Sequence, residues 1–287
     1  MIVSASRRTD IPAFYSDWLR NRLLAGYALV RNPYRPDQLR RVDLRPEAVD
    51  GLVLWSKCPH PLLEKPETLE ALSPYPYYLQ FTLTPYGPDV EPGLPDKQKV
   101  LIPCFQRLSE MLGANRVLWR YDPILVSPRH TAAFHLAAFA RFADALAGYT
   151  RQCTISFLDL YRHIDAPMRG LGVVDPSEAE KRNLSEALAK IADARGMSLC
   201  ACAEPLDLSA QGVSPARCVD ASLLSQISGK PFKFRKDPAQ REGCGCAQSV
   251  DIGIYHSCPN GCLYCYANHG ENAIKKRIAL YDALSSI

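Results

Sequence analysis

Three cysteines near the end of the sequence have the type and spacing of ligands for an iron–sulfur cluster. They form a CxxxCxxC motif: Cys258, Cys262 and Cys265. Three thiolates in one short loop can hold three irons of a cubane [4Fe–4S] cluster, and nothing within the motif supplies a fourth ligand, so one iron would stay open. Gly261 allows the loop to turn tightly, and Tyr264 would shield the cluster from solvent. The alternative is a zinc site that borrows Cys244 or Cys246 as its fourth ligand.

Five more cysteines lie between positions 200 and 246, which is more than packing requires. Four of them are predicted to ligate an auxiliary [4Fe–4S] cluster: Cys202, Cys218, Cys244 and Cys246. Cys200 is expected on the opposite face of its strand, packed in the wall of the fold. Two outcomes compete with this prediction. The same four cysteines could bind a structural zinc ion, or Cys244 or Cys246 could be the fourth ligand of the cluster at the CxxxCxxC motif, which would leave that cluster without an open iron. Cys58, Cys104 and Cys153 stand alone and are expected in the core.

Charged residues follow several apolar runs, at points where the ends of neighbouring strands would bring them together. Six of them are predicted to form a catalytic or substrate-binding group: Arg7, Arg8, Asp10, Lys57, Arg120 and Asp122. Two adjacent arginines can hold a carboxylate or phosphate in bidentate fashion. A salt bridge from this arginine pair to Asp10 is the alternative.

The elements that must position these residues are short β-type runs alternating with segments of helical period, which is typical of βα units around a parallel sheet. The expected strands are 2–4, 27–30, 52–55, 78–83, 117–119, 154–157, 198–201 and 250–255. One helix is expected to begin with Asp175 as its N-cap and to stop at Gly196. The alternation predicts an α/β fold, a full or partial (β/α) barrel whose polar strand ends face one cavity. An open doubly wound sheet is the alternative, because sequence alone does not show closure.

This prediction divides the chain into three parts. Residues 1–204 would form the barrel-like domain, 205–249 a cysteine-rich segment with the auxiliary cluster, and 250–287 the final strand, the cluster loop and a C-terminal helix that complete the barrel. The middle part is rich in turns and charge, which suits a segment that wraps around a metal centre.

The CxxxCxxC motif, with an aromatic residue before its last cysteine, resembles the signature of the radical S-adenosylmethionine (radical SAM) enzymes. The whole chain is similar to the bacterial family DUF1848, with matching pieces at 6–12, 55–57, 119–123 and 244–267. The radical SAM resemblance implies that the open iron binds S-adenosylmethionine, whose reductive cleavage yields a radical that abstracts hydrogen from a substrate. An electron donor such as flavodoxin or ferredoxin is then expected. Glu204, after an expected strand, is a candidate for binding the ribose or the methionyl amino group.

The position of the motif departs from the radical SAM pattern. In those enzymes the cluster loop follows the first barrel strand, whereas here it follows the last expected strand. We therefore expect a circular permutation, in which 250–255 corresponds to the first strand of those enzymes and 2–4 to the next. These two strands must then lie side by side. The stretch at 9–12 also resembles the Thr-Asp-Pro-Tyr stretch of the spore photoproduct lyase group, which implies a more distant kinship.

Composition sets the outer limits on function. A chain of 287 residues that is 47% hydrophobic and 22% charged is long enough to bury a full core. It has no apolar run of membrane-spanning length and no signal core, so we expect a cytoplasmic protein, in which eleven cysteines favour metal ligation over disulfides. The 34 basic residues are balanced by 30 acidic ones, so nucleic-acid binding is possible but not favoured.

These observations predict a radical SAM-type enzyme with two [4Fe–4S] clusters, acting on a small-molecule or nucleotide-like substrate that the sequence does not identify. One alternative is an S-adenosylmethionine-independent iron–sulfur protein that transfers electrons or binds in response to redox state. A zinc-stabilised nucleic-acid-binding module is the other, and it would bind in a salt-sensitive way.

Overall fold

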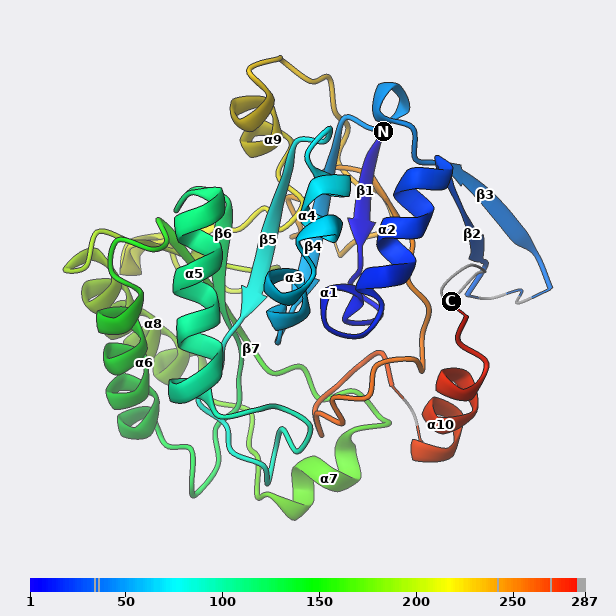
Figure 1. The fold of residues 1–287 in the computed structure, drawn as a ribbon. Coiled ribbons are helices and arrows are strands. Elements are labelled where there is room, and N and C mark those ends of the chain that lie inside the picture. The colour runs from blue at the N-terminus through cyan, green and yellow to red at the C-terminus, as the bar shows by residue number, and fades with distance from the viewer. Residues whose placement is uncertain (34, 36, 242, 269, 283–287) are drawn as a thin grey trace.

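The structure is a computed structural model that describes residues 1–33, 35, 37–241, 243–268 and 270–282. Within these residues, eight strands form one sheet in the order β10-β1-β4-β5-β6-β7-β8-β9, and every neighbouring pair runs parallel. Their bounds are β1 (Ile2–Ala5), β4 (Gly51–Ser56), β5 (Tyr77–Thr82), β6 (Val117–Ile124), β7 (Gln152–Phe157), β8 (Ser198–Ala201), β9 (Val213–Pro215) and β10 (Ser249–Asp251). Figure 1 labels β1, β4, β5, β6 and β7 of this sheet. The α/β class predicted from the sequence is confirmed.

Helices connect most of the strands. They are α1 (Ile11–Phe14), α2 (Ser16–Ala25), α3 (His60–Glu64), α4 (Pro66–Leu72), α5 (Ile102–Leu112), α6 (Ala132–Leu146), α7 (Asp165–Gly170), α8 (Glu178–Asp193), α9 (Ala221–Ser228) and α10 (Glu271–Ala279), with single helical turns at Pro46–Ala48, Lys97–Leu101 and Ser209–Gln211. No helix in the described part of the chain is long and apolar enough to cross a membrane.

The start of α8 differs from its prediction. Ser177, not Asp175, caps the helix, and it forms a capping box in which the side chains of Ser177 and Glu180 each bond the backbone N–H of the other. Asp175 instead pairs with Lys181 at 2.7 Å. The capping box wins because it satisfies two free N–H groups at once, where a single aspartate would satisfy one.

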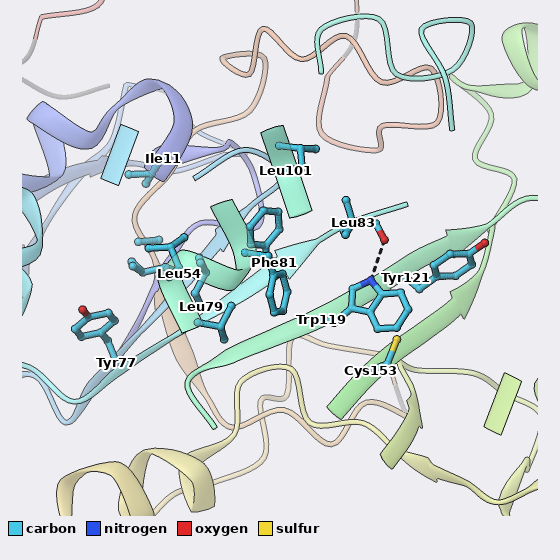
Figure 2. Close-up of a cluster of buried hydrophobic side chains, with 14 of the residues drawn as sticks. Ile11, Leu54, Tyr77, Leu79, Phe81, Leu83, Leu101, Trp119, Tyr121 and Cys153 are labelled. Carbon is cyan, nitrogen blue, oxygen red and sulfur yellow. Dashed lines mark hydrogen bonds between the residues drawn. The ribbon is translucent and has the colours of Figure 1, made fainter. Parts of the chain in front are cut away.

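Alternate residues of each strand belong to opposite faces of the sheet, because successive side chains point to opposite sides. In β5, Leu79 and Phe81 lie in the large core, whereas Tyr78 lies in a different cluster. Helices α1 to α6 and α8 all contribute to the large core. In this core Trp119 is fully buried and donates its indole N–H to the Leu83 carbonyl at 2.9 Å (Figure 2).

The cysteine-rich segment, which includes α9, covers the second face of the sheet. Five strands contribute to this smaller cluster: Ile2, Val53, Tyr78, Leu118 and Cys200. Cys218, Cys244 and Cys246 are buried against them, and Cys202 packs at the edge. Cys200 therefore shares a face with Cys202, and the expectation that it points the other way is wrong, because residues two apart on a strand face the same side.

The sheet is not closed in the residues that the structure describes, since β10 and β9 are its two edges. The predicted neighbours at the start and end of the chain do pair, with Ile2 opposite Ser249 and Val3 opposite Val250. The run at 27–30 is not part of this sheet. It lies in β2 (Tyr27–Arg31), which forms an antiparallel hairpin with β3 (Leu39–Asp43). Its burial alternates along the strand, as expected of a ribbon with one covered face.

Candidate active site at the carboxyl ends of the strands

The carboxyl ends of the parallel strands meet at one edge of the sheet, where ligands commonly bind in α/β proteins. All six charged residues predicted from the sequence lie in or directly after strands at this edge: Arg7, Arg8, Asp10, Lys57, Arg120 and Asp122. The CxxxCxxC loop follows β10 at the same edge. The strand order therefore brings the predicted charged group and the predicted cluster loop together.

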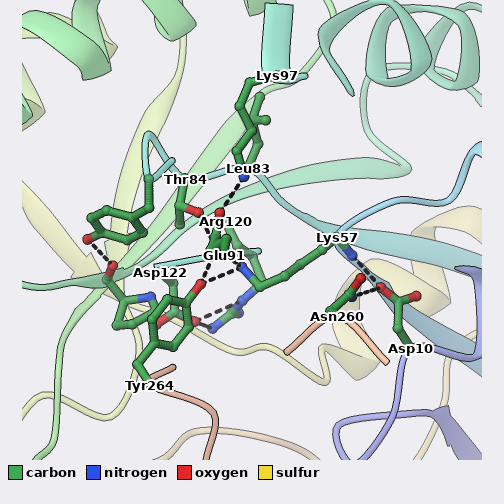
Figure 3. Close-up of polar contacts among 12 residues, drawn as sticks. Asp10, Lys57, Leu83, Thr84, Glu91, Lys97, Arg120, Asp122, Asn260 and Tyr264 are labelled. Atoms are coloured by element: carbon green, nitrogen blue, oxygen red, sulfur yellow. Dashed lines mark hydrogen bonds and ion pairs between the residues drawn. The ribbon is translucent and has the colours of Figure 1, made fainter. Parts of the chain in front are cut away.

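Glu91 is the centre of a buried ion-pair network that the sequence analysis missed (Figure 3). Its side chain is only 1% exposed. Oε1 accepts hydrogen bonds from Lys57 Nζ at 2.8 Å, from the Thr84 hydroxyl at 2.7 Å and from the Tyr264 hydroxyl, while Oε2 pairs with Lys97. Lys57 also donates to the Tyr264 hydroxyl at 2.7 Å. The network thus fixes Tyr264 of the cluster loop to the ends of β4 and β5.

The ionisation of Glu91 predicts a specific pH dependence. Burial penalises its charge, but the ion pairs with Lys57 and Lys97 outweigh that penalty and lower the pKa of Glu91 to about 2. Because this pKa lies below the ordinary value of 4.5, the carboxylate contributes stability above pH 4.5, and this contribution is lost as the pH falls toward 2. We expect the free energy of unfolding to differ between wild type and Glu91→Gln by an amount that shrinks across this window, measured by urea unfolding at each pH. A difference that is independent of pH would contradict the ion pairs.

Asp10 holds the start of α1 against β4 and the cluster loop. Its carboxylate accepts hydrogen bonds from the Ala13 N–H at 3.1 Å, the Ser56 hydroxyl at 2.6 Å, the Lys57 N–H at 2.8 Å and the Asn260 side-chain amide at 3.4 Å. Burial raises its pKa. Neither arginine of the preceding turn is among the hydrogen-bond or ion-pair partners recorded for Asp10, so the alternative of a salt bridge from the arginine pair is not what these residues form. Asp10 acts here as a positioning residue.

The two arginines after β1 turn toward different partners. The Arg7 guanidinium lies 5.7 Å from the ring centre of Trp55 and 4.0 Å from the Asp237 carboxylate. The Arg8 guanidinium lies 5.2 Å from the ring centre of Tyr255. In this arrangement the pair does not present a single bidentate anion site.

Arg120 and Asp122 form an ion pair within β6, and Asp122 also accepts a hydrogen bond from the Ser156 hydroxyl. Arg120 is 5% exposed. Its Nη1 lies 2.9 Å from Cys218 Sγ, and its guanidinium lies 5.4 Å from the ring centre of Trp55, whose ring Arg7 also contacts. Arg120 therefore connects the charged group at the strand ends to the second group of cysteines.

The CxxxCxxC loop is held by backbone hydrogen bonds to the loop that follows β5. The Leu263 N–H donates to the Val90 carbonyl at 3.0 Å, and the Gly93 N–H donates to the Asn260 carbonyl at 2.9 Å. Gly261 has φ +66°, the left-handed conformation that the tight turn was expected to need. Tyr264, which precedes the last cysteine, is buried in a small hydrophobic cluster with Tyr86 and Val90; its role as an aromatic cover for a cluster stays a prediction.

The three thiols of the motif belong to half-buried residues and interact electrostatically with one another. Burial raises the pKa of Cys262 to about 12, and it also raises the pKa of Cys258 and Cys265. Backbone N–H groups of Ala267 and Asn268 donate to Cys265. The free thiols therefore keep their protons at neutral pH, and a metal centre would have to displace them on binding.

Three buried acceptor atoms, in the cluster loop and in the turn after β1, have no hydrogen-bond partner: Thr9 Oγ1, Asn260 Oδ1 and Asn268 Oδ1. Such atoms carry a desolvation cost unless a ligand donates to them. As they stand, no group of three or more His, Cys, Asp or Glu side chains in the described residues is placed to hold a metal ion. In type and number, however, three thiols on one loop beside unpartnered acceptors fit a cubane cluster with a polar ligand.

Two other predictions concern residues further along the same edge. Glu204 accepts a hydrogen bond from the Phe157 N–H at 2.7 Å, and burial raises its pKa, so its contacts tie β8 to the end of β7.

The four cysteines assigned to a second centre do meet: Cys202 contacts Cys218, and Cys246 contacts both Cys218 and Cys244. Cys104 and Cys153 are buried in the large core and Cys58 packs against it, as expected.

The fold and this edge define a class of protein: an α/β protein with an eight-stranded parallel sheet in its described part, a CxxxCxxC loop at the carboxyl ends of the strands and a second group of cysteines on one face. The family described as "Domain of unknown function (DUF1848)" matches residues 2–267. The chain belongs to this family, as the motif pieces predicted. No curated protein matches the chain.

Proposed function

We propose that the protein is a radical SAM-type enzyme in which three cysteines hold a [4Fe–4S] cluster with one open iron: Cys258, Cys262 and Cys265. When bound, the cluster and S-adenosylmethionine would supply reductive cleavage of the sulfonium and hydrogen abstraction from a substrate, with the electron provided by a flavodoxin or ferredoxin. The observation that carries the proposal is a set of three buried acceptors without hydrogen-bond partners: Asn260 Oδ1 and Asn268 Oδ1, in and next to the motif, and Thr9 Oγ1 in the turn after β1. A ligand with an ammonium group and hydroxyls would satisfy them.

The pairing of β1 with β10 supports the circular-permutation part of the proposal. A permuted radical SAM barrel requires the strand before the cluster loop to lie beside the first strand of the chain, and Val3 lies opposite Val250. In this interpretation the open eight-stranded sheet is a partial barrel. Its edge strands β9 and β10 do not pair, and the cysteine-rich segment packs on one of its faces.

The residues of the chain would hold the ligands and exclude water. Tyr264 packs against Tyr86 with ring centres 5.9 Å apart, and both rings lie under the cluster loop. Lys57 and Glu91 fix the Tyr264 hydroxyl from the other side. A substrate would bind near Arg7 and Arg8, while Arg120 and its partner Asp122 keep the end of β6 in place. A water-excluded site is what radical chemistry requires.

The test is anaerobic purification of the full chain, iron and sulfide analysis, and electron paramagnetic resonance of the reduced protein with and without S-adenosylmethionine. We expect about four irons at the motif and a spectrum that changes on adding S-adenosylmethionine. Cys262→Ser should remove this iron and the spectral change. Cys58→Ser, which alters a half-buried cysteine outside both groups, should leave both as in wild type.

Other outcomes of the same measurements would contradict the proposal. Four irons with a spectrum that ignores S-adenosylmethionine would favour an iron–sulfur electron-transfer or redox-responsive protein. Zinc in place of iron at the motif would exclude both kinds of iron–sulfur protein and favour a zinc-stabilised module.

A further inference from the structure

Four cysteine side chains meet on the second face of the sheet, apart from the CxxxCxxC motif: Cys202, Cys218, Cys244 and Cys246. The Sγ atoms of Cys202 and Cys218 are 3.1 Å apart. Cys246 interacts electrostatically with both Cys218 and Cys244. The four side chains thus form one chain of contacts, from Cys202 through Cys218 and Cys246 to Cys244.

The spacing of these sulfurs suits a single metal ion better than a cluster. In a tetrathiolate zinc site, Zn–S distances of about 2.3 Å place the sulfurs about 3.8 Å from one another. Widening the Cys202–Cys218 distance by about 0.7 Å brings this pair of sulfurs to that spacing. In a cubane cluster, each thiolate binds a different iron, so its four cysteine sulfurs are held apart by the whole cluster and do not touch. Contact between sulfurs is therefore the opposite of what a cubane needs.

Two arginines and a backbone N–H group lie beside the four sulfurs. Arg120 places Nη1 2.9 Å from Cys218 Sγ, and Arg7 interacts electrostatically with Cys218 and Cys246. The backbone N–H of Val219 donates to Cys246 Sγ at 3.3 Å. Four thiolates around one divalent ion carry two net negative charges, and these two guanidinium groups would offset part of that charge in addition to their pairs with Asp122 and Asp237.

The cysteines come from both edges of the open sheet. Cys202 follows β8 and Cys218 follows β9 at one edge, whereas Cys244 and Cys246 precede β10 at the other. In the described residues between β9 and β10, α9 is the one helix, and the hydrogen bonds recorded from this segment to the sheet include Ala216 N–H to the Ala201 carbonyl and the Tyr78 hydroxyl to the Cys218 carbonyl. A metal ion bound by cysteines from both sides of the segment would add further links between it and the sheet.

We propose that these four cysteines bind one structural zinc ion that joins the two edges of the sheet across its second face. The proposal stands apart from the radical SAM function, because it involves none of the motif cysteines. It selects zinc over the second [4Fe–4S] cluster that the sequence also allowed.

The test uses the full chain purified anaerobically, with zinc and iron counted separately and the zinc environment measured by X-ray absorption. We expect about one zinc per chain, bound by four sulfurs at about 2.3 Å. Cys244→Ser should lose the zinc and lower the melting temperature while the iron at the motif is kept. Cys200→Ser is the matched control, because Cys200 lies in the same buried cluster outside the chain of contacts, and it should keep the zinc.

A wild-type measurement covers the case in which Cys244→Ser does not fold. Protein produced with cobalt in place of zinc should show the intense visible absorption of a tetrahedral cobalt thiolate site. The proposal is overturned by about eight irons with no zinc, which would mean a second cubane, by a disulfide between Cys202 and Cys218, or by zinc that survives Cys244→Ser. Loss of motif iron alone would overturn the radical SAM proposal and leave this one intact.

Discussion

Replacing Glu91 with alanine is expected to destabilise the protein by about 3–5 kcal/mol, the range seen when one partner of a buried ion pair is removed. The side chain is 1% exposed and is the shared partner of Lys57 and Lys97. Without it, two buried ammonium groups lose their counter-charge, and Thr84 and Tyr264 lose their acceptor. The free energy of unfolding from urea titration at neutral pH measures the effect.

Glu110→Ala is the control for this substitution. Glu110 pairs with Arg107 at 3.2 Å on the exposed side of α5, where both side chains are at least half exposed. Exposed pairs contribute little, so we expect a change within about 0.5 kcal/mol. Equal effects at the two positions would mean that Glu91 does not hold the cluster loop as described.

Gly93→Ala is expected to displace the CxxxCxxC loop. A Cβ at this position would lie 2.5 Å from the Asn260 carbonyl oxygen and 2.8 Å from the Asn260 carbonyl carbon and Cα. These are backbone atoms, so the clash cannot be relieved by a side-chain rotation, and the Gly93 to Asn260 hydrogen bond must lengthen or break. We expect a loss of about 1–3 kcal/mol in stability, as in other overpacked sites, together with loss of motif iron.

Gly170→Ala separates this steric effect from the general effect of replacing a glycine. A Cβ at Gly170, the last residue of α7, would meet no atom within 4 Å. We expect its stability and iron content to match those of wild type. If Gly93→Ala retained full iron, the contact between the two loops would not be needed to form the site.

The strands were predictable where burial on both faces leaves a continuous apolar run. The run at 198–201 coincides with β8, and the run at 2–4 falls within β1. The edge strand β9 escaped prediction because Val213–Pro215 is short and contains proline, which cannot donate a backbone hydrogen bond. Closure of the sheet is a property of how two edges meet, and no single apolar run encodes it.

The site was predictable where a residue carries its own signal. The CxxxCxxC spacing and the charged residues after strands fall at one edge, as expected. Glu91 and Gly93 carry no such signal, because they lie in a loop rich in proline and glycine that matches no motif. The one available hint was physical: a lysine at the end of an apolar strand, such as Lys57, needs a carboxylate once it is buried, and the sequence does not say which one.

The place of β1 between β4 and β10 has a consequence for biosynthesis. A ribosome releases β1 and β4 long before β10, so one side of β1 keeps unpaired N–H and C=O groups until β10 has been made. The cysteine-rich segment that covers the second face of the sheet also emerges late. A nascent chain that stalls before residue 249 would therefore display both a bare strand edge and an uncovered apolar surface, and it would depend on chaperones to avoid aggregation.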